Sequence, residues 1–318
     1  TQAPPPPPAP ETQLDEGINA DELQDKTFAP IRWVVPGLIV EGLTLLAGKP
    51  KRGKSWLALN CGLAVAGGGL ALGHVACEEG DVLALMLEDN QRRLQDRLRQ
   101  LEPNTAWPKR LRLQVDWPRL GAGALEALEA WVQAAANPRL ILIDVLARVR
   151  ATADPRKSPY ADDYGALEGL HKFASKHRLA VVAIHHCRKA KADEDAFDEI
   201  SCTTGLTGAA DSALVLKRGE GVTDFLYGRG RDLPEFEKAV RFDKTRGLWQ
   251  LLGDADAFRG AQTEKSVLDV LADATEPLSI KEVVAAVGGN YDAVKQRLYE
   301  MLRGNLIRRV ERGRYAPA

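Results

Sequence analysis

The sequence predicts an α/β fold: a mostly parallel sheet with helices on its faces, followed by a small second unit. Two observations predict the sheet. Short runs such as 43–47 and 140–146 are apolar almost throughout, as in strands that are buried on both faces. Amphipathic stretches such as 92–101 separate them, and this alternation is typical of parallel strands joined by helices. A third observation, the glycine-rich segment 48–55 between a strand and a helix, indicates a ligand site at one edge of the sheet.

The predicted elements follow in chain order from Ile31. Strands are expected at 43–47, 82–88, 111–115, 140–146 and 181–185. Helices are expected between them at 55–66, 92–101, 125–136 and 164–177. Further apolar runs follow in close succession and predict antiparallel hairpins at the end of this domain, at 212–217, 225–228, 239–242 and 248–252.

Two segments flank this domain, which is expected to cover residues 30–258. Residues 1–29 are predicted to be a tail, because the proline run 4–8 favours polyproline II and the acidic stretch after it is poor in aromatics. A linker and a partner-binding segment both fit such a tail. Residues 262–318 are expected to form three helices and a hairpin around Arg312 and Gly313, which is the winged-helix arrangement.

Composition is that of an ordinary globular protein. Hydrophobic residues make up 45% of the 318 residues, and the net charge of -1 excludes a whole-chain attraction to nucleic acid or membrane. No apolar run reaches the roughly 20 residues that span a bilayer, and the N-terminus lacks a signal-peptide layout. The cysteines have neither disulfide nor zinc spacing, which predicts reduced thiols in a cytoplasmic protein, at Cys61, Cys77, Cys187 and Cys202.

The segment 48–55 matches the phosphate-binding pattern G-x-x-x-x-G-K-[ST] in full. Its glycines let the backbone N–H groups point at phosphate oxygens, Lys54 reaches the terminal phosphates, and the Ser55 hydroxyl ligates Mg²⁺. A glycine-rich turn with a solvated lysine is the alternative, but the apolar strand before the motif and the helix after it favour the P-loop. The predicted contacts with ATP are Gly48, Lys49, Pro50, Lys51, Arg52, Gly53, Lys54, Ser55 and Trp56.

Acidic residues end two of the predicted strands. Asp144 ends an apolar strand and is the predicted Walker B aspartate, a ligand of Mg²⁺ together with Ser55. Glu88 ends another, at the carboxyl edge where ligands gather in open α/β sheets. We expect Glu88 to be the base that activates water, with Asp89 as the second candidate. Helix capping is the alternative for these acids, and Asp89 suits that role better than Glu88.

Two adjacent histidines, His185 and His186, end a further apolar strand. Neighbouring strand residues point to opposite faces, so only one of them can face the nucleotide, where it could hydrogen-bond to the γ-phosphate. A metal site with Cys187 is a weaker alternative, because adjacent residues cannot easily converge on one ion.

Taken in order, these motifs resemble the RepA-type hexameric helicases, which are RecA-like ATPases of plasmids, phages and mobile elements. The resemblance covers residues 31–252, and its specific parts are the stretches His-His-Cys-Arg-Lys-Ala at 185–190 and Gly-Leu-Thr-Gly-Ala-Ala-Asp at 205–211. The P-loop, Leu87-Glu88-Asp89, Arg97-Leu98 and Asp144 complete the ordered set. The resemblance implies a RecA-like fold and a ring in which ATP lies between subunits.

The resemblance also implies residue roles. Lys54 and Ser55 would bind phosphate and Mg²⁺, Glu88 would be the base, Asp144 the Walker B acid, and one histidine the γ-phosphate sensor. A neighbouring subunit would supply an arginine that stabilises the transition state, an effect worth about 10³–10⁵ in rate. The candidates are Arg229 and Arg231, with Arg218 third; a solvated charge at a strand end is the alternative for each.

Two basic segments are candidate DNA contacts. Lys189 and Lys191 lie in a polar stretch that the resemblance places at the central channel, on single-stranded DNA, although the acids at 193–195 weaken the charge. The third C-terminal helix and the hairpin would place cations on duplex phosphates, but winged helices also dock proteins, so both roles remain open. The cations there are Lys295, Arg297, Arg303, Arg308, Arg309, Arg312 and Arg314.

The expected function is an ATP-driven DNA helicase or helicase-like replication ATPase, with ATP and Mg²⁺ as cofactors. Its expected partners are single-stranded and duplex DNA, further copies of the chain in a hexamer, and other replication proteins. A DNA-bound regulator or helicase loader that uses ATP as a switch is the alternative. A non-catalytic binding module is disfavoured, because Lys54, Ser55, Glu88 and Asp144 are all intact.

Overall fold

The computed structural model describes residues 17–150, 159–186, 197, 208–219, 223–288 and 290–318. The chain divides into a unit of residues 1–31 and a unit of residues 32–318. The described part of the first unit contains one short helix, α1 (Ala20–Gln24), none of whose residues is buried. The elements below all belong to the second unit.

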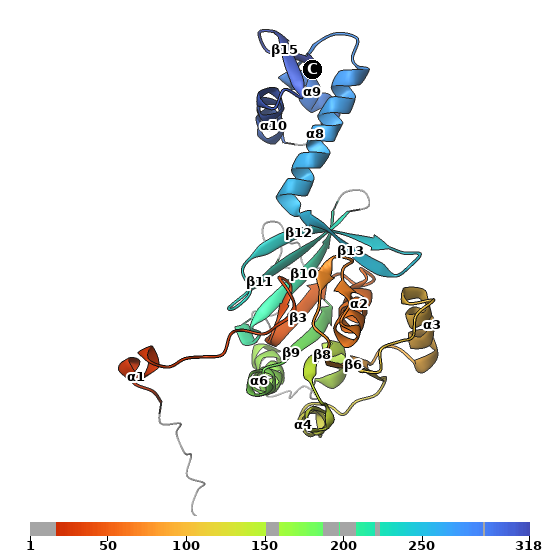
Figure 1. Cartoon of the computed structure of the whole chain (residues 1–318), viewed down its shortest axis with the longest axis vertical. Helices are drawn as coiled ribbons and strands as arrows, with labels where there is room; N and C mark the ends of the chain where they lie inside the picture. Colours follow the sequence, from red (N-terminus) through yellow and green to blue (C-terminus); the bar gives the residue numbers. More distant parts are fainter. Residues whose placement is uncertain (1–16, 151–158, 187–196, 198–207, 220–222, 289) are drawn as a thin grey trace, which may run out of the picture. The chain divides into compact units, whose positions relative to one another are not determined.

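Within the described residues, a nine-stranded sheet forms the centre of this unit, in the order β13-β12-β11-β10-β3-β9-β8-β6-β7. Its parallel strands are β3 (Gly42–Gly48), β6 (Asp81–Met86), β7 (Leu111–Gln114), β8 (Pro138–Asp144), β9 (Ala180–His186) and β10 (Ser212–Arg218). Antiparallel pairing adds β11 (Asp224–Gly230), β12 (Phe236–Asp243) and β13 (Leu248–Asp254). The predicted parallel sheet with antiparallel hairpins at its end is confirmed (Figure 1).

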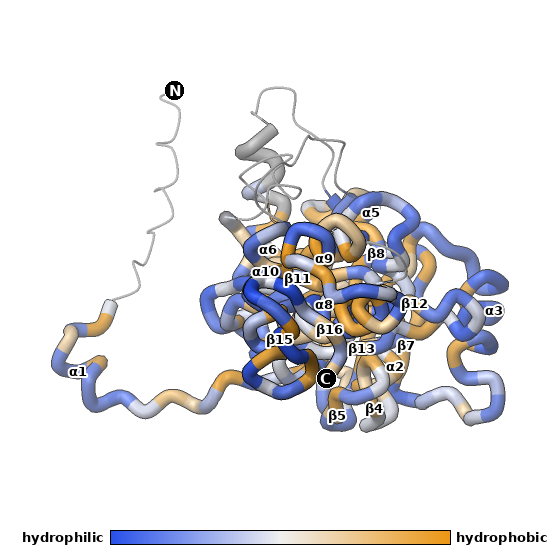
Figure 2. The backbone as a smooth tube through the Cα atoms, turned by 90° about the horizontal axis from the view of Figure 1, so that it is seen from above, coloured by the Kyte–Doolittle hydropathy of each residue, from blue (hydrophilic) through white to orange (hydrophobic). Residues whose placement is uncertain are grey.

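Helices cover both faces of the sheet. On one face lies α2 (Lys54–Gly67), which packs on strand side chains such as Leu142 and Ile184. On the other face lie α4 (Ala124–Ala134), α5 (Leu146–Val149) and α6 (Pro159–His177), against Ile143 and Ala183. Outside α2, α3 (Gln91–Leu101) packs on that helix through a small leucine cluster. Figure 2 shows hydrophobic segments alternating with hydrophilic ones along the backbone of this unit.

Two strands end two residues earlier than predicted. The apolar run 140–146 is expected to be one strand, but β8 ends at Asp144 and Leu146 begins α5. Leu146 is fully buried although it lies in a helical turn. A buried strand and a buried helical turn both need apolar residues, so hydrophobicity alone does not distinguish them. Likewise β6 ends at Met86, which leaves Glu88 in the turn after the strand.

Two short hairpins have no counterpart in the predicted elements. They are formed by β1 (Trp33–Val35) with β2 (Ile39–Val40) and by β4 (Leu70–Ala71) with β5 (Val75–Ala76). Strands of two or three residues are too short for alternation to be read from the sequence. No helix in the described ranges is long and apolar enough to cross a membrane. Cys61 and Cys77 are buried free thiols, and the other two cysteines lie outside the described residues.

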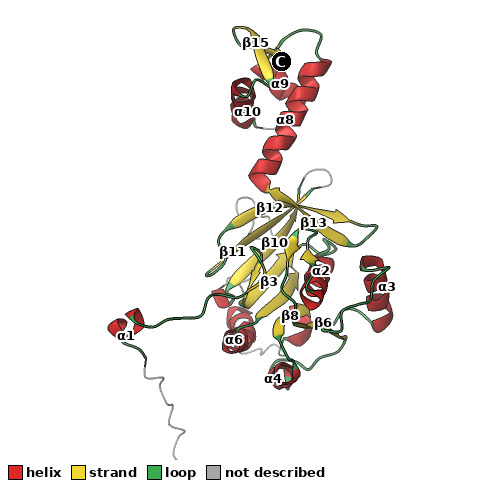
Figure 3. Cartoon of the chain, viewed as in Figure 1, coloured by secondary structure: helices red, strands yellow, loops and turns green. Residues whose placement is uncertain are grey.

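The C-terminal residues have a hydrophobic core of their own. It is built by α8 (Ala255–Asp273), α9 (Ile280–Val287) and α10 (Tyr291–Arg303) with a sheet of β14 (Leu278–Ser279), β16 (Arg314–Pro317) and β15 (Ile307–Glu311). Val267, Val283 and Leu298 are its most buried members. The predicted start of this module at residue 262 falls inside α8, which is one continuous helix that follows β13 directly (Figure 3).

Candidate nucleotide-binding site

The P-loop connects β3 with α2 at the carboxyl edge of the sheet. The Lys54 ammonium lies inside the loop and donates to the carbonyl oxygens of Gly48 and Lys49, at 2.7 and 2.9 Å. Gly48 has a φ of 146°, and a Cβ there would lie 2.7 Å from the carbonyl oxygen of Leu216 on β10. Gly53 has a φ of 85° and begins α2. Both glycines are therefore required by backbone conformation, and Gly48 also by the close approach of β10.

Asp144, at the end of β8, lies beside the first turn of α2. It is 2% exposed, its Oδ1 has no hydrogen-bond partner among the described residues, and the Ser55 side chain is near enough to act on its pKa. Burial raises the pKa of Asp144 above its ordinary value of 3.8, and the charge of Glu88 adds to this, while Ser55 and Arg97 oppose it. A buried carboxylate oxygen without a donor, next to a serine hydroxyl, suits a hard cation.

Ser55 and Asp144 therefore fit the predicted Mg²⁺ site. No group of three or more His, Cys, Asp or Glu side chains with metal-binding geometry occurs in the part of the chain that the structure describes. The other ligands would be phosphate and water oxygens, which is the coordination that Mg²⁺ prefers in nucleotide sites.

Asp144→Asn should stabilise the nucleotide-free protein at pH 7 and weaken Mg²⁺-dependent nucleotide binding. The folded-state pKa of Asp144 lies above its unfolded value, so the ionised carboxylate destabilises the fold, and stability falls as pH rises from 3.8 through the folded pKa. We therefore expect the melting temperature of the variant at pH 7 to lie above that of the wild-type protein. Thermal melts with and without Mg²⁺ and ADP measure both effects.

The advantage of the asparagine variant should shrink as the pH is lowered toward 3.8, because Asp144 then becomes protonated in the folded wild-type protein. A variant that melts below wild type at pH 7 and keeps its Mg²⁺ response would contradict the assignment.

Glu88 and Asp89 follow β6 at the same edge but differ in their partners. The Asp89 side chain is 6% exposed and pairs with Arg93 at 3.2 Å and with Arg97 at 2.6 Å. Asn90, not Asp89, is the N-cap of α3, so the alternative of a capping role does not apply to Asp89; the two arginines hold its carboxylate instead. The Glu88 side chain is 46% exposed and makes no such pair with either arginine side chain, which leaves it accessible at the edge of the sheet.

The two predicted histidines, His185 and His186, lie on opposite faces of the strand β9. Ile184 belongs to the core on the α2 side and Ala183 to the core on the opposite side. By alternation, His186 lies on the α2 side and His185 on the other. The Nε2 atom of His186 lies 3.6 Å from Oε2 of Glu88, and its Nδ1 has no hydrogen-bond partner among the described residues. The structure thus brings His186, and not His185, together with the candidate base.

Arg229 and Arg231 lie at the opposite edge of the sheet from the P-loop. Arg229 pairs in register with Ala213 near the start of β10. Arg231 pairs at 3.3 Å with Asp211, whose carboxylate also accepts the backbone N–H of Leu43 at the start of β3. By register Arg229 lies level with Leu45, about 10 Å along the sheet from Gly48, and Arg231 lies level with Leu43, about 17 Å from it. Both are also two strands away from β3, so neither arginine lies beside the P-loop of its own chain.

Arg218, the third candidate, lies at the P-loop edge. It ends β10 and lines a hollow of about 580 Å³ with Arg52, Lys244 and Phe242. This position allows it to contact a nucleotide bound by its own chain. Lys189 and Lys191 lie outside the described residues.

The C-terminal cations form two groups. Arg297 pairs with Glu300 within α10 at 2.9 Å and lies 4.0 Å from Glu264 on α8. Arg314 donates to the carbonyl oxygen of Pro277 at 2.7 Å, so both arginines link elements of the module. Lys295 on α10 is half-buried. The exposed cations of the β15–β16 hairpin are Arg308, Arg309, Arg312 and Arg314 itself.

Three aromatic side chains pack beside the P-loop. The ring of Trp56, a predicted ATP contact, lies 6.2 Å from the ring of Phe242 and under the guanidinium of Arg97 at 5.2 Å. Trp249 donates from its indole Nε1 to the carbonyl oxygen of Gly53 at 3.0 Å. Sequence reasoning missed Trp249, because it lies 196 residues from Gly53 and no local motif marks it.

Comparison with known proteins agrees with this geometry. The chain matches the AAA domain family over residues 8–192. It is similar to a solved structure described as an ATPase domain, with a TM-score of 0.52 and 14% identity over 67% of this chain and 85% of that chain. It is also similar to a DnaB-like replicative helicase solved for its interactions with primase, with a TM-score of 0.52 and 13% identity over 68% of this chain and 58% of that chain.

These two likenesses establish the fold, and the predicted RecA-like sheet with flanking helices is confirmed. The family match covers more than half of the chain and includes the P-loop, the Walker B strand and both histidines. This protein therefore belongs to the AAA domain family.

Proposed function

We propose that this protein hydrolyses ATP with Mg²⁺ and acts on DNA, as a helicase or a helicase-like replication ATPase of the RepA type from a mobile element. The observation that carries the proposal is the convergence of four groups at one sheet edge: the Lys54 ammonium in the P-loop, the Ser55–Asp144 pair, Glu88 and His186. They come from different elements, so the fold and not a local motif assembles them.

Each group has a role in this proposal. Lys54 and the backbone N–H groups at the start of α2 bind the phosphates, and Ser55 with Asp144 holds Mg²⁺, which offsets charge on the terminal phosphates. Glu88 orients and deprotonates the attacking water. His186, 3.6 Å from Glu88, can donate to the γ-phosphate and so link phosphate occupancy to the position of the base.

The position of Arg229 and Arg231 supports a ring in which ATP lies between subunits. Both line a hollow of about 500 Å³ at the edge opposite the P-loop. Stacking identical subunits head to tail brings that edge of one chain to the P-loop edge of the next, and such contacts close into rings. In this arrangement the arginine of one subunit completes the site of its neighbour.

The C-terminal module, proposed as a winged-helix domain after an ATPase domain of residues 30–258, would bind duplex DNA through its hairpin. The exposed side chains of α10 include Asp292 and Glu300 beside Arg303, so that helix presents little net charge. The hairpin presents Arg308, Arg309 and Arg312. Lys189 and Lys191 would contact single-stranded DNA.

Replacing Arg308 and Arg312 by glutamine should weaken duplex binding and reduce its salt dependence. Each phosphate contact contributes about 0.9 to the slope of log K against log salt, so the slope should fall by up to about 1.8. Fluorescence anisotropy with a short duplex at several salt concentrations measures this. Lys265→Gln with Lys281→Gln is the matched control, because it removes two exposed cations of the same module away from the hairpin. Unchanged duplex affinity in the arginine variant would contradict DNA binding by the hairpin and favour a module that binds another protein.

A strand-displacement assay tests the proposed function against its alternative. The helicase proposal expects ATP-dependent unwinding of a duplex with a single-stranded tail, together with DNA-stimulated ATP hydrolysis. Hydrolysis that DNA stimulates without any unwinding would favour the regulator or helicase loader. A mass measurement with and without a non-hydrolysable ATP analogue tests the ring.

A further inference from the structure

Trp249 joins the last strand of the sheet to the P-loop. It is the largest fully buried side chain among the described residues. The carbonyl oxygen of Gly53 accepts two hydrogen bonds: one from the backbone N–H of Leu57 at 2.9 Å, which is the first bond of α2, and one from the Trp249 indole at 3.0 Å. A Cβ on Gly53 would lie 3.0 Å from the Trp249 ring, so the indole packs directly against the loop.

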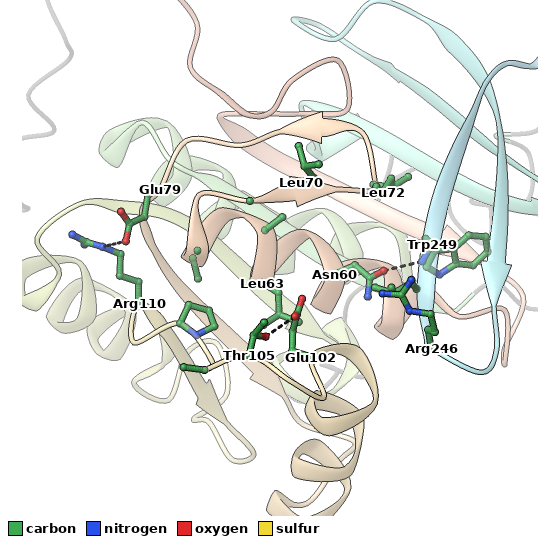
Figure 4. A pocket seen from close by; sticks show the side chains of 18 of the residues that line it. Asn60, Leu63, Leu70, Leu72, Glu79, Glu102, Thr105, Arg110, Arg246 and Trp249 are labelled. Atoms are coloured by element: carbon green, nitrogen blue, oxygen red, sulfur yellow. Dashed lines mark hydrogen bonds and ion pairs between the residues drawn. The ribbon is translucent and has the colours of Figure 1, made fainter.

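A second contact holds Trp249 in this place. Asn60 lies two turns after Gly53 on the same face of α2, and its Oδ1 accepts the backbone N–H of Trp249 at 2.8 Å. The Nδ2 of Asn60 donates to the carbonyl oxygen of Gly247 at 3.3 Å. Figure 4 shows Asn60 reaching from α2 to Trp249 on β13. The backbone and the indole of Trp249 are thus fixed to two points of one helix.

Aromatic packing completes the support. The Phe242 ring lies 5.0 Å from that of Trp249. At Gly247, which has a φ of 67°, a Cβ would lie 2.4 Å from the Trp56 ring, so the turn before β13 sits tightly on α2. The indole therefore has little freedom to leave Gly53.

The hydrogen bond from the Trp249 indole acts on the peptide group between Gly53 and Lys54. In the planar trans peptide between Gly53 and Lys54, the C=O and the N–H point in opposite directions. A donor that fixes the carbonyl therefore fixes the direction of the Lys54 N–H, one of the orphan donors at the start of α2 that point at phosphate. It also polarises the peptide and makes that N–H a stronger donor.

We propose that Trp249 is a positioning residue of the nucleotide site: its indole N–H, through the Gly53 carbonyl, aims the Lys54 backbone N–H at the bound phosphate. This inference rests on nucleotide binding at the P-loop, and it adds a side chain from the last strand of the sheet to that site. The contribution is to binding, because no group of Trp249 reaches the attacking water.

Trp249→Phe tests the proposal, because it keeps an aromatic ring and removes the donor. We expect the dissociation constant for Mg²⁺ and ADP to rise about three- to tenfold, the effect of one neutral hydrogen bond. The KM for ATP should rise in parallel, and kcat should change much less. Trp107→Phe is the matched control, since its indole also donates to a backbone carbonyl, that of Glu102 at 3.3 Å, away from the P-loop.

A second measurement keeps the test valid if the variant folds poorly. Fluorotryptophan placed only at position 249 of the full chain should show a ¹⁹F shift when Mg²⁺ and ADP bind, and the same label at position 107 should not. Equal nucleotide affinity in Trp249→Phe and wild type, or a label at 249 that does not respond to saturating nucleotide, overturns the inference. Failure of the wild-type protein to bind nucleotide overturns the proposed function instead.

Discussion

Lys54→Ala is expected to lower the rate of ATP hydrolysis by about 100-fold or more, the cost of losing one preorganised charge at a transferring phosphate. The structure gives the reason. The ammonium already lies inside the loop, 2.7 Å from the carbonyl oxygen of Gly48 and 2.9 Å from that of Lys49, so its charge is held at the centre of the loop. Steady-state phosphate release with the purified variant measures the effect.

Lys51→Ala is the matched control for this variant. Lys51 belongs to the same loop, is exposed and has a φ of 61°, so its removal takes away one loop cation without emptying the centre of the loop. We expect a much smaller loss of activity from it. An undiminished rate in Lys54→Ala would falsify the assignment of the nucleotide site.

The sheet was predictable from the sequence because burial on both faces leaves a continuous apolar signal. The runs that became β3, β8 and β9 are hydrophobic at almost every position, and their order fixes a parallel sheet once helices separate them. Strand ends were less predictable. The charged residue Asp144 marks the end of β8, but Leu146 is just as buried in the helical turn that follows. An apolar run indicates burial and does not say whether the buried residues form a strand or a helix.

The residues of the candidate site also differ in how far the sequence predicts them. Gly48, Lys54 and Ser55 were predictable, because a P-loop is one continuous segment whose chemistry fixes its spacing. The choice between His185 and His186 needed the structure, since alternation says that they differ in face but not which face carries α2. Trp249 was not predictable, because its contact with the loop depends on how β13 packs on α2.

The partners of Asp89 show how a local pattern can mislead. An acid just before a helix is typical of a cap, yet Asn90 takes that position and accepts the backbone N–H of Arg93. Asp89 is instead enclosed by Arg93 and Arg97, whose side chains fold back from α3. The arrangement leaves Glu88 as the acid that is accessible at the sheet edge and nearest to His186.

Arg231→Ala should reduce hydrolysis by about 10³-fold or more if this residue completes the neighbouring site. Arg231 is the better candidate of the pair. Its side chain is 61% exposed and paired with Asp211, while the guanidinium of Arg229 stacks on the buried ring of Phe197 at 3.9 Å. Removing Arg231 leaves Asp211 with His171 at 2.9 Å and the Leu43 N–H, so the fold should persist.

Mixing two inactive variants separates an arginine that acts between subunits from one that acts within its own chain. A Lys54→Ala subunit retains Arg231, and an Arg231→Ala subunit retains its P-loop, so about a quarter of the interfaces in a random ring would be complete. Hydrolysis should therefore reappear in the mixture, while Arg241→Ala, an exposed arginine on β12, should behave as wild type throughout. Recovery can arise only if an arginine crosses the interface, because neither variant carries both an intact P-loop and Arg231 in one chain. A mixture that stays inactive would contradict the shared site.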